Sequence, residues 1–150
     1  FSVELPAAPS SSGPQGDIPE VEIDDRLLIL LFEDDFAQQQ LVHDYLGTWD
    51  FQLITTATPA HGIEIARAIQ PDVIITDLMM PEMSGWDVLR VLKGDPQTTD
   101  IPVIIMSIID QRMMGMSMGA SDYLIKPVNR KALVNLLKNY RMRVERRVKK

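Results

Sequence analysis

The sequence predicts an α/β fold in which five parallel strands alternate with five helices. Short apolar runs of strand length begin at Leu27 and alternate with segments whose apolar residues recur at helical spacing. Strands that alternate with helices are typical of a parallel sheet that helices cover on both faces. At 150 residues the chain is long enough for one such domain.

The first two strand–helix pairs follow one another closely. Strands are expected at 27–32 and 51–55, where apolar residues run together. Apolar residues at helical spacing predict a helix over 37–46. A second helix is expected over 59–69, because its first position is Pro59 and a missing N–H costs nothing there.

The third pair has the clearest helix boundaries. A strand is expected at 73–76 and a helix at 85–93. Ser84 can cap the N terminus of this helix, and Gly94 and Pro96 end it.

The last two pairs contain the weakest of the expected helices. Strands are expected at 103–106 and 123–125, and the helix between them would cover only 111–118. Because Gly115 interrupts this segment, we expect it to be short, irregular or mobile. Asn129 caps a final helix with one apolar stripe. The stripe consists of Leu133, Leu136, Leu137, Tyr140 and Val144.

Composition excludes several classes of protein. The chain has no cysteine, so disulfide and thiolate chemistry are excluded, which fits a reducing cytosol. The longest apolar runs are about six residues, far below the roughly 20 that a membrane-spanning helix needs. No signal-peptide pattern is present. We therefore expect a cytoplasmic domain without membrane contact in this segment, although the parent protein could be anchored elsewhere.

Charge is distributed unevenly along the chain. Residues 1–129 hold 20 of the 21 acidic side chains and 6 of the 15 basic ones, whereas residues 130–150 hold 9 basic side chains and one acidic one. The basic helix is either an ordinary solvated face, a docking surface for an acidic partner or a junction to another domain. Nucleic-acid binding is not expected, because the acidic body would repel phosphates.

Polar side chains follow four of the five expected strands. Glu33 and Asp34 follow the first strand, Asp77 the third, Ser107 the fourth and Lys126 the fifth. In a doubly wound sheet such strand ends converge where ligands bind. Crowded carboxylates are costly unless a cation lies between them, and oxygen ligands without His or Cys suit Mg²⁺, for which Mn²⁺ could substitute.

This group of residues predicts a site that accepts a phosphoryl group. Asp77 would be the nucleophile, the metal ion would neutralise developing charge, and Ser107 and Lys126 would hold the phosphoryl oxygens. The alternative is a structural cluster of salt bridges between Lys126 and the acids.

Four segments within residues 26–140 resemble the two-component receiver domain, the phosphoacceptor module of response regulators and hybrid histidine kinases. They are LLFEDD (30–35), DVIITDLMMPEMSG (72–85), IPVIIMS (101–107) and GASDYLIKP (119–127). The resemblance implies a flavodoxin-like, doubly wound fold with strand order 2-1-3-4-5. It also implies that a phosphohistidine is the phosphoryl donor.

The resemblance assigns roles to the site residues one by one. It implies that Asp77 is phosphorylated, that Glu33 and Asp34 are the acids of the metal site, and that the backbone carbonyl of Met79 is a further metal ligand. Ser107 takes the position of the hydroxyl switch, Tyr123 that of the aromatic switch and Lys126 that of the family's lysine. The Lys126–Pro127 bond would be cis.

Two departures from the family pattern affect the fourth strand and the helix after it. Ser107 and Lys126 are 19 positions apart (126 − 107), fewer than the resemblance leads us to expect. Ile108 stands where a small residue is usual, so access to the site would be tighter. A methionine cluster in the shortened region is either core filler or an adaptable interaction patch. The cluster consists of Met113, Met114, Met116 and Met118.

The residues that precede the domain suggest a longer parent protein. Residues 1–6, FSVELP, resemble the last strand of histidine-kinase ATP-binding domains, and residues 7–25 are expected to form a flexible linker. Residues 26–150 would then be the receiver domain with an extended basic C-terminal helix. A chain that opens on Phe1 suggests a fragment or a processed product, and a parent chain is expected to be a sensor histidine kinase.

The leading hypothesis is therefore the C-terminal receiver of a hybrid histidine kinase, with a phosphohistidine donor in the same or another chain and a possible histidine phosphotransfer acceptor downstream. A stand-alone response regulator is the nearest alternative. An aspartate-based phosphohydrolase typically needs a second Asp two positions after the nucleophile, and Met79 stands there. A pseudo-receiver is disfavoured because the five strand-end residues are all retained. The domain itself would catalyse only its own phosphorylation and dephosphorylation.

The phosphorylated state is expected to be long-lived. Hydrolysis needs a water aligned with the phosphorus, and a polar side chain near the pocket mouth positions such a water best. Met79 and Ile109 are the side chains expected to flank that path, and both are apolar.

Overall fold

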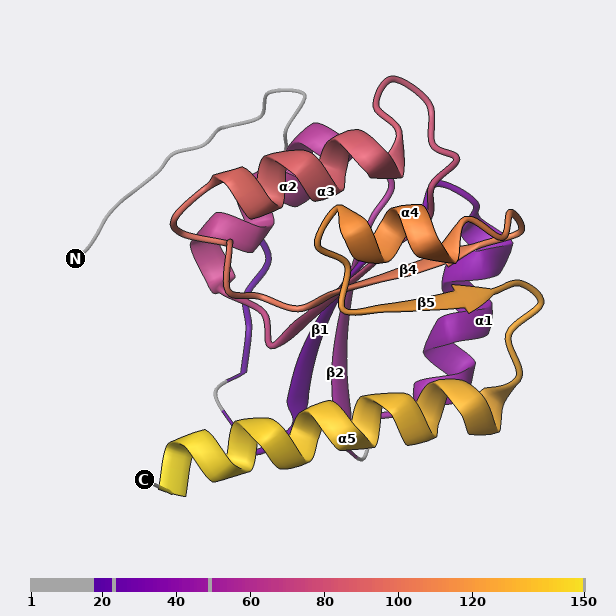
Figure 1. Cartoon of the computed structure of the whole chain (residues 1–150). Helices are drawn as coiled ribbons and strands as arrows, with labels where there is room; N and C mark the ends of the chain where they lie inside the picture. The colour runs from indigo at the N-terminus through magenta and orange to yellow at the C-terminus, as the bar shows by residue number, and fades with distance from the viewer. Residues whose placement is uncertain (1–17, 23, 49, 150) are drawn as a thin grey trace.

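A computed structural model of the chain describes residues 18–22, 24–48 and 50–149 (Figure 1). Five parallel strands form one sheet in the order β2-β1-β3-β4-β5, which confirms the predicted fold class. The strands are β1 (Leu27–Phe32), β2 (Phe51–Thr56), β3 (Val73–Thr76), β4 (Val103–Ser107) and β5 (Asp122–Ile125). The helices are α1 (Phe36–Leu46), α2 (Pro59–Ile69), α3 (Gly85–Gly94), α4 (Arg112–Ser117) and α5 (Arg130–Lys149). The expected strand at 1–6 and most of the expected linker lie outside the described residues.

The sheet is covered on both faces because alternate strand residues point to opposite sides. In β1, Leu30 and Phe32 pack in a buried cluster with α2 and α3, whereas Ile29 and Leu31 pack in a second cluster with α1 and α5. Figure 1 shows α2, α3 and α4 on one side of the sheet and α5 on the other. Every residue of β1 is buried, as expected for a strand between two helical layers.

Strand register brings the predicted site together at one edge of the sheet. Phe32 of β1 pairs with Thr76 of β3, so the residues that follow them, Glu33 and Asp77, emerge side by side. β1 and β3 are the central strands at which the chain changes direction across the sheet. Ligands of open α/β sheets bind in the crevice at such a point.

Several elements extend one residue beyond the predicted bounds for identifiable reasons. The Oδ1 of Asp35 accepts a hydrogen bond from the backbone N–H of Ala37 at 2.9 Å, so α1 begins at Phe36 rather than at residue 37. β4 includes Ser107 because this residue pairs with Ile125 of β5. The predicted helix over 111–118 is reduced to six residues, and Gln111 at its N terminus makes no side-chain capping bond.

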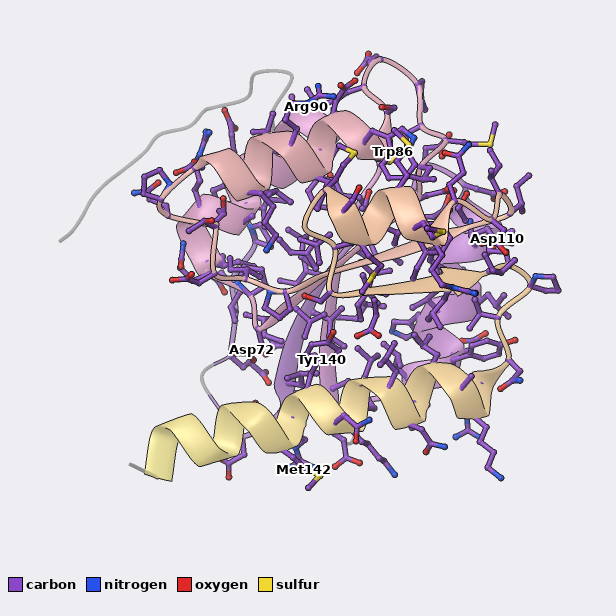
Figure 2. All side chains as sticks on the ribbon, in the orientation of Figure 1. Asp72, Trp86, Arg90, Asp110, Tyr140 and Met142 are labelled. Carbon is purple, nitrogen blue, oxygen red and sulfur yellow. The ribbon has the colours of Figure 1, made fainter. Side chains whose placement is uncertain are left out.

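Helix α5 packs on the sheet through the predicted apolar stripe as far as Tyr140, and the side chain of Val144 lies outside the described residues. Leu133, Leu137 and Tyr140 are buried in the cluster that also contains α1 residues. Figure 2 shows Tyr140 on the side of α5 that faces the sheet and Met142 on the opposite side. The side chain of Arg141 pairs with Asp50 at 3.0 Å and so joins α5 to the start of β2.

The residues just before β1 contact the edge strand β2. With its amide oriented to match both groups, Gln52 donates to the carbonyl of Glu22 at 3.0 Å and accepts from its N–H at 2.9 Å. The guanidinium of Arg26 binds the carboxylates of Glu22 and Asp24 and donates to the carbonyl of Thr48 at 3.3 Å. The end of the expected linker is therefore tied to the domain.

Among the described residues, none of the helices combines the length and the apolar character that crossing a membrane would require.

Candidate functional site

Three carboxylates converge at the carboxyl ends of β1 and β3. One oxygen from each of Glu33, Asp34 and Asp77 lies within 4.8 Å of the others. Glu33 is 1% exposed and Asp77 is 8% exposed, whereas Asp34 is open to solvent. Two of the three acids are thus held away from water, where carboxylates repel one another strongly unless positive charge is nearby.

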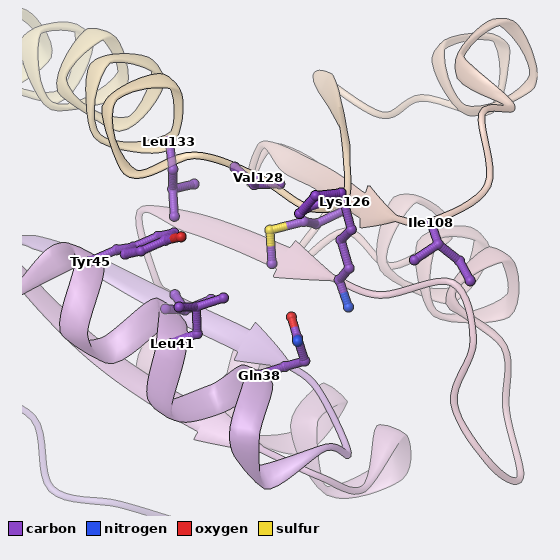
Figure 3. A pocket seen from close by; sticks show the side chains of 10 residues that line it. Gln38, Leu41, Tyr45, Ile108, Lys126, Val128 and Leu133 are labelled. Atoms are coloured by element: carbon purple, nitrogen blue, oxygen red, sulfur yellow. The ribbon is translucent and has the colours of Figure 1, made fainter.

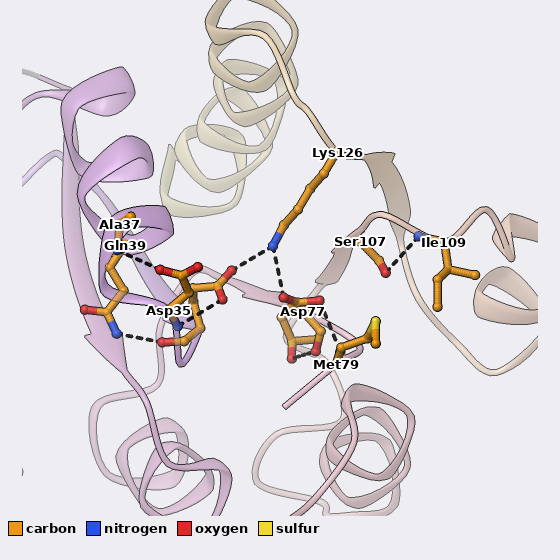
Figure 4. Close-up of polar contacts among 10 residues, drawn as sticks. Asp35, Ala37, Gln39, Asp77, Met79, Ser107, Ile109 and Lys126 are labelled. Carbon is orange, nitrogen blue, oxygen red and sulfur yellow. Dashed lines mark hydrogen bonds and ion pairs between the residues drawn. The ribbon is translucent and has the colours of Figure 1, made fainter. Parts of the chain in front are cut away.

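Lys126, which directly follows β5, provides positive charge to this group of acids. Its Nζ donates to Oε1 of Glu33 and to Oδ2 of Asp77, both at 2.9 Å (Figure 4). The peptide bond between Lys126 and Pro127 is cis, as the resemblance implies. The ammonium is largely buried, so its two ion pairs are poorly screened by water.

Burial and ion pairing shift the pKa values of Glu33 and Lys126. Burial raises the pKa of Glu33 and the charge of Asp77 raises it further, while the hydrogen bond and charge of Lys126 oppose the rise. Burial acts to lower the pKa of Lys126, but its hydrogen bonds to Glu33 and Asp77 outweigh burial and the pKa is raised. The lysine therefore stays protonated and offsets the repulsion between the acids.

The backbone around the acids fixes their direction. Oδ1 of Asp77 accepts from the N–H of Met79 at 3.1 Å, and Oε2 of Glu33 accepts from the N–H of Asp35 at 3.3 Å. The side-chain amide of Gln39 donates to the carbonyl of Glu33 at 2.6 Å. These bonds fit a site in which carboxylate oxygens must face one point rather than rotate freely.

Gly85 allows α3 to begin directly against the backbone of Asp77. A Cβ at Gly85 would lie 2.3 Å from the carbonyl oxygen of Asp77 and 2.7 Å from Cα of Leu78. Because no side chain fits at that separation, any other residue would displace the segment that carries Asp77. The N–H of Gly85 also donates to the carbonyl of Leu78 at 2.9 Å, which closes the loop between β3 and α3.

The donor set fits a small divalent cation. Glu33, Asp34 and Asp77 offer carboxylate oxygens alone, which are the ligands that Mg²⁺ and Mn²⁺ prefer over nitrogen or sulfur. Lys126 occupies one oxygen of Glu33 and one of Asp77, and the second oxygen of each accepts a single backbone N–H and keeps a lone pair that can face an ion together with the oxygens of Asp34. The exposure of Asp34 leaves the group open to solvent on one side.

Ser107 and Tyr123 contact the loop between β4 and α4. The buried Ser107 accepts a hydrogen bond at Oγ from the N–H of Ile109 at 3.2 Å. Tyr123, also buried, donates through its hydroxyl to the carbonyl of Ile109 and accepts from the N–H of Gln111 at 3.1 Å. Among the hydrogen bonds of the described residues, none joins Ser107 to Asp77. The two predicted switch residues are thus connected to each other through Ile109.

The ring of Tyr123 lies against α4 where that helix has no side chain. A Cβ at Gly115 would lie 3.0 Å from Cδ2 of Tyr123, a separation that would force one of the two to move. Exposed methionines occupy the outer surface of α4, with Met113 86% exposed. Met113, Met114 and Met116 are therefore not core filler, and an interaction patch fits their exposure, whereas Met118 packs against the core cluster that contains Tyr123.

An apolar pocket of about 240 Å³ adjoins Lys126 between α1 and the start of α5 (Figure 3). Leu41 and Tyr45 line it from α1, Leu133 lines it from α5, and Ile108 closes the side nearest β4. Ile108 is exposed at this pocket, and tighter access to the acids through this residue stays a prediction.

Sequence reasoning assigned no role to Gly85, Gln39 or Asp35. Asp35 could have been recognised from its position directly before a helical segment, because Asp is favoured as a helix cap. Gln39 lies in the first turn of α1, and no local sequence pattern predicts that its amide contacts the carbonyl of Glu33. The need for glycine at position 85 depends on how closely α3 approaches β3, which a local pattern does not contain.

Residues 29–138 match the family described as the response regulator receiver domain. Among curated proteins, the cell cycle response regulator CtrA of Brucella ovis is 35% identical over 107 residues, which make up 71% of this chain and 46% of that protein. CtrA of Brucella abortus has the same identity. The chain thus spans about half the length of the curated relatives that it matches.

Solved structures show the same arrangement of elements. The receiver domain of a signal transduction histidine kinase from Syntrophus aciditrophicus has a TM-score of 0.72 at 30% identity, and the match covers 79% of this chain and 92% of that one. The chemotaxis response regulator CheY4 of Vibrio cholerae has a TM-score of 0.71 at 24% identity, over 77% of this chain and 98% of that one.

Proposed function

The chain belongs to the response regulator receiver domain family, and we propose that it accepts a phosphoryl group from a phosphohistidine onto Asp77 in the presence of Mg²⁺. The observation that carries this proposal is the meeting of Glu33, Asp34 and Asp77 at one strand edge with Lys126 between two of them. Carboxylates that are aimed at a common point fit a divalent cation, which together with the lysine would offset the charge of an arriving anionic group.

In the proposed reaction, an oxygen of Asp77 forms a bond to phosphorus while the bond between phosphorus and the donor's imidazole nitrogen breaks. Lys126, already within 2.9 Å of Oδ2 of Asp77, is positioned to neutralise an oxygen of the transferred group. Ser107 ends β4 at the same edge of the sheet, and its hydroxyl can donate a hydrogen bond to another oxygen of the transferred group. A Mg²⁺ ion held by the acids, with the carbonyl of Met79 as a further ligand, would supply charge neutralisation.

For the wider context of the domain, we propose the receiver of a hybrid histidine kinase. The FSVELP run before the linker supports this context, as does the likeness to a histidine-kinase receiver at 30% identity. The 35% identity to CtrA, which is named a response regulator, favours a second candidate, the receiver of a stand-alone regulator. In either context the phosphoryl chemistry at Asp77 is the same.

The apolar pocket between α1 and α5 is suited to bind an apolar surface of the protein that carries the phosphohistidine. It is lined by Leu41, Tyr45 and Leu133 and adjoins Lys126, which contacts Asp77. A phosphohistidine can reach Asp77 only if the donor covers the surface around the strand ends. Burial of apolar side chains in this pocket would stabilise that encounter by the hydrophobic effect.

The metal requirement can be tested with phosphoramidate, a small donor whose phosphorus–nitrogen bond resembles that of phosphohistidine. We expect wild-type protein to be labelled with Mg²⁺ and not with EDTA. Asp34→Ala should lose labelling at a Mg²⁺ concentration that saturates the wild type, because the variant lacks the most accessible of the three acids. Asp44→Ala is the matched control, since it removes an exposed carboxylate on α1 outside this group. If Asp34→Ala is labelled as fast as wild type, the assignment of the metal site is wrong.

A further inference from the structure

The chain exposes thioether sulfur at several positions although it has no cysteine. Five of its nine methionines have exposed side chains, and they are Met79, Met113, Met114, Met116 and Met142. An oxidant that reacts with sulfur in this chain must therefore react with methionine. Exposed thioethers are converted to sulfoxides by peroxides, and the products can be reduced again by methionine sulfoxide reductases.

Met79 differs from the other four because it lies beside the proposed phosphoacceptor. It is two residues from Asp77, and its N–H donates to Oδ1 of Asp77 at 3.1 Å (Figure 4). This bond fixes the backbone of Met79 at the carboxylate, while the side chain remains 55% exposed. The thioether is thus accessible to a small oxidant, and its backbone is held beside Asp77, where the side chain is expected to flank the path to the carboxylate.

We propose that Met79 is an oxidation site through which peroxide shortens the lifetime of the aspartyl phosphate. In the oxidation, one oxygen atom passes from hydrogen peroxide to the thioether, so the sulfur is oxidised by two electrons and the peroxide is reduced to water. The product replaces an apolar group beside Asp77 with a polar S=O group. This inference rests on the proposed function, because it concerns the phosphorylated form of Asp77.

The sulfoxide oxygen can accept a hydrogen bond from the water that attacks phosphorus. A water that attacks phosphorus must direct a lone pair at it, so its hydrogens point away and need an acceptor. A thioether is a poor acceptor, whereas a sulfoxide oxygen is a strong one and can hold such a water in place. Attack then forms a bond from water to phosphorus, breaks the bond from phosphorus to Asp77, releases inorganic phosphate and a proton, and restores the carboxylate.

The neighbouring apolar side chain does not supply this acceptor. Ile109, 38% exposed on the loop after β4, is the other residue expected to flank the path. It has no polar side-chain atom and cannot be oxidised by peroxide. Met113 is more exposed than Met79, at 86%, but it lies on α4. Oxidation at Met113 should therefore proceed readily and leave hydrolysis at Asp77 unaffected.

The test uses the full chain, treated with hydrogen peroxide or left untreated and then freed of oxidant. Peptide mass spectrometry measures sulfoxide at each methionine. Each sample is phosphorylated with acetyl phosphate and Mg²⁺, the donor is removed, and loss of the phosphoryl group is followed by intact mass. We expect peroxide to accelerate decay in wild type by about two- to tenfold, the range that one hydrogen bond to the attacking water is worth. Methionine sulfoxide reductases with a thiol reductant should reverse the effect.

Two variants separate Met79 from the remaining methionines. Met79→Leu should show no peroxide response, because its other exposed methionines are still oxidised while position 79 is not. Met113→Leu should respond as wild type does. The inference is overturned if wild type decays at the same rate before and after complete oxidation of Met79, if Met79 resists peroxide, or if Met79→Leu is accelerated as well. Failure of acetyl phosphate to label the untreated protein would instead overturn the proposed function, and this inference with it.

Discussion

Lys126 is the side chain on which the arrangement of the acidic group most depends. It contacts both buried acids at 2.9 Å, and without it Glu33 and Asp77 would face each other without compensating charge. Removal of one partner from a buried ion pair is strongly destabilising, because the remaining charge stays buried and unpaired. The same contact prepares the site for an anion, because the ammonium is already next to the carboxylate that we propose is phosphorylated.

The raised pKa of Glu33 predicts a specific pH dependence of stability. Because the folded state holds the proton of Glu33 more tightly than the unfolded state does, the contribution of this residue is most favourable at low pH and declines as pH rises through its raised pKa. Glu33→Gln removes this titration. In urea unfolding from about pH 4 to neutrality, the free energy of unfolding of wild type should therefore fall relative to that of Glu33→Gln as pH rises.

Glu64→Gln provides the control for this comparison, because it replaces an exposed carboxyl group on α2. Its unfolding free energy should follow that of wild type over the same range. A difference between wild type and Glu33→Gln that does not change with pH would contradict the burial argument.

The apolar character of position 79 predicts a long-lived aspartyl phosphate without any oxidant. Met79→Asn introduces a hydrogen-bond acceptor beside Asp77 and should accelerate hydrolysis by about two- to tenfold, which corresponds to one ordinary hydrogen bond. The decay of the phosphoryl group after removal of acetyl phosphate measures this rate. An unchanged or slower decay in the variant would show that Met79 does not shield the phosphoryl group.

At the residue scale, the sequence predicted which side chains meet at the strand ends but not the contacts that support them. Glu33, Asp77 and Lys126 could be predicted because each directly follows an apolar run, and parallel strands end at one edge of the sheet. Gly85 could not be assigned a role, since its close approach to Asp77 depends on how α3 packs against β3. Contacts of this kind are set by tertiary distances, which residue order does not encode locally.

Helix α4 is short in the structure, as the sequence predicts. It has six residues, Gln111 gives it no side-chain cap, and Gly115 lies at its buried side. Isolated helices of this length are marginal and depend on packing. The contacts that hold it come from Tyr123, whose hydroxyl bonds to the loop before the helix and whose ring lies against Gly115.

These features predict faster amide exchange across residues 109–119 than across α3 or α5. Tyr123→Phe removes the bonds to Ile109 and Gln111 and should increase exchange in this segment further, with little change in α3. Hydrogen exchange followed by mass spectrometry resolves these segments. Protection of 109–119 equal to that of α5 would refute the prediction.

At the element scale, the bounds that the sequence missed have local causes. The cap at Asp35 moves the start of α1 by one residue, and pairing with β5 extends β4 to Ser107. The short α4 was expected because its glycine and its length are both visible in the sequence. The contact of Glu22 with Gln52 on β2 was not, because linker composition indicates only that a segment lacks helix or strand.

On the scale of the whole molecule, the fold could be predicted because apolar strands and amphipathic helices alternate without interruption. That alternation leaves one class of fold, and the order β2-β1-β3-β4-β5 places the polar strand ends together. Charge is divided on the same scale, with the acids concentrated before residue 130 and the bases in α5. The site therefore lies in an acidic body, which makes a bound cation important for the approach of any anionic donor.

Intact mass spectrometry detects directly whether Asp77 accepts the phosphoryl group. After incubation with acetyl phosphate and Mg²⁺, wild type should gain the mass of one phosphoryl group, and peptide mapping should locate it at Asp77. Asp77→Asn should gain none, because the amide is not a nucleophile of this kind although it keeps the size of the side chain. Equal gain of mass in Asp77→Asn, or no gain in wild type, would show that Asp77 is not the phosphoacceptor and leave the acids and Lys126 as a structural cluster of salt bridges.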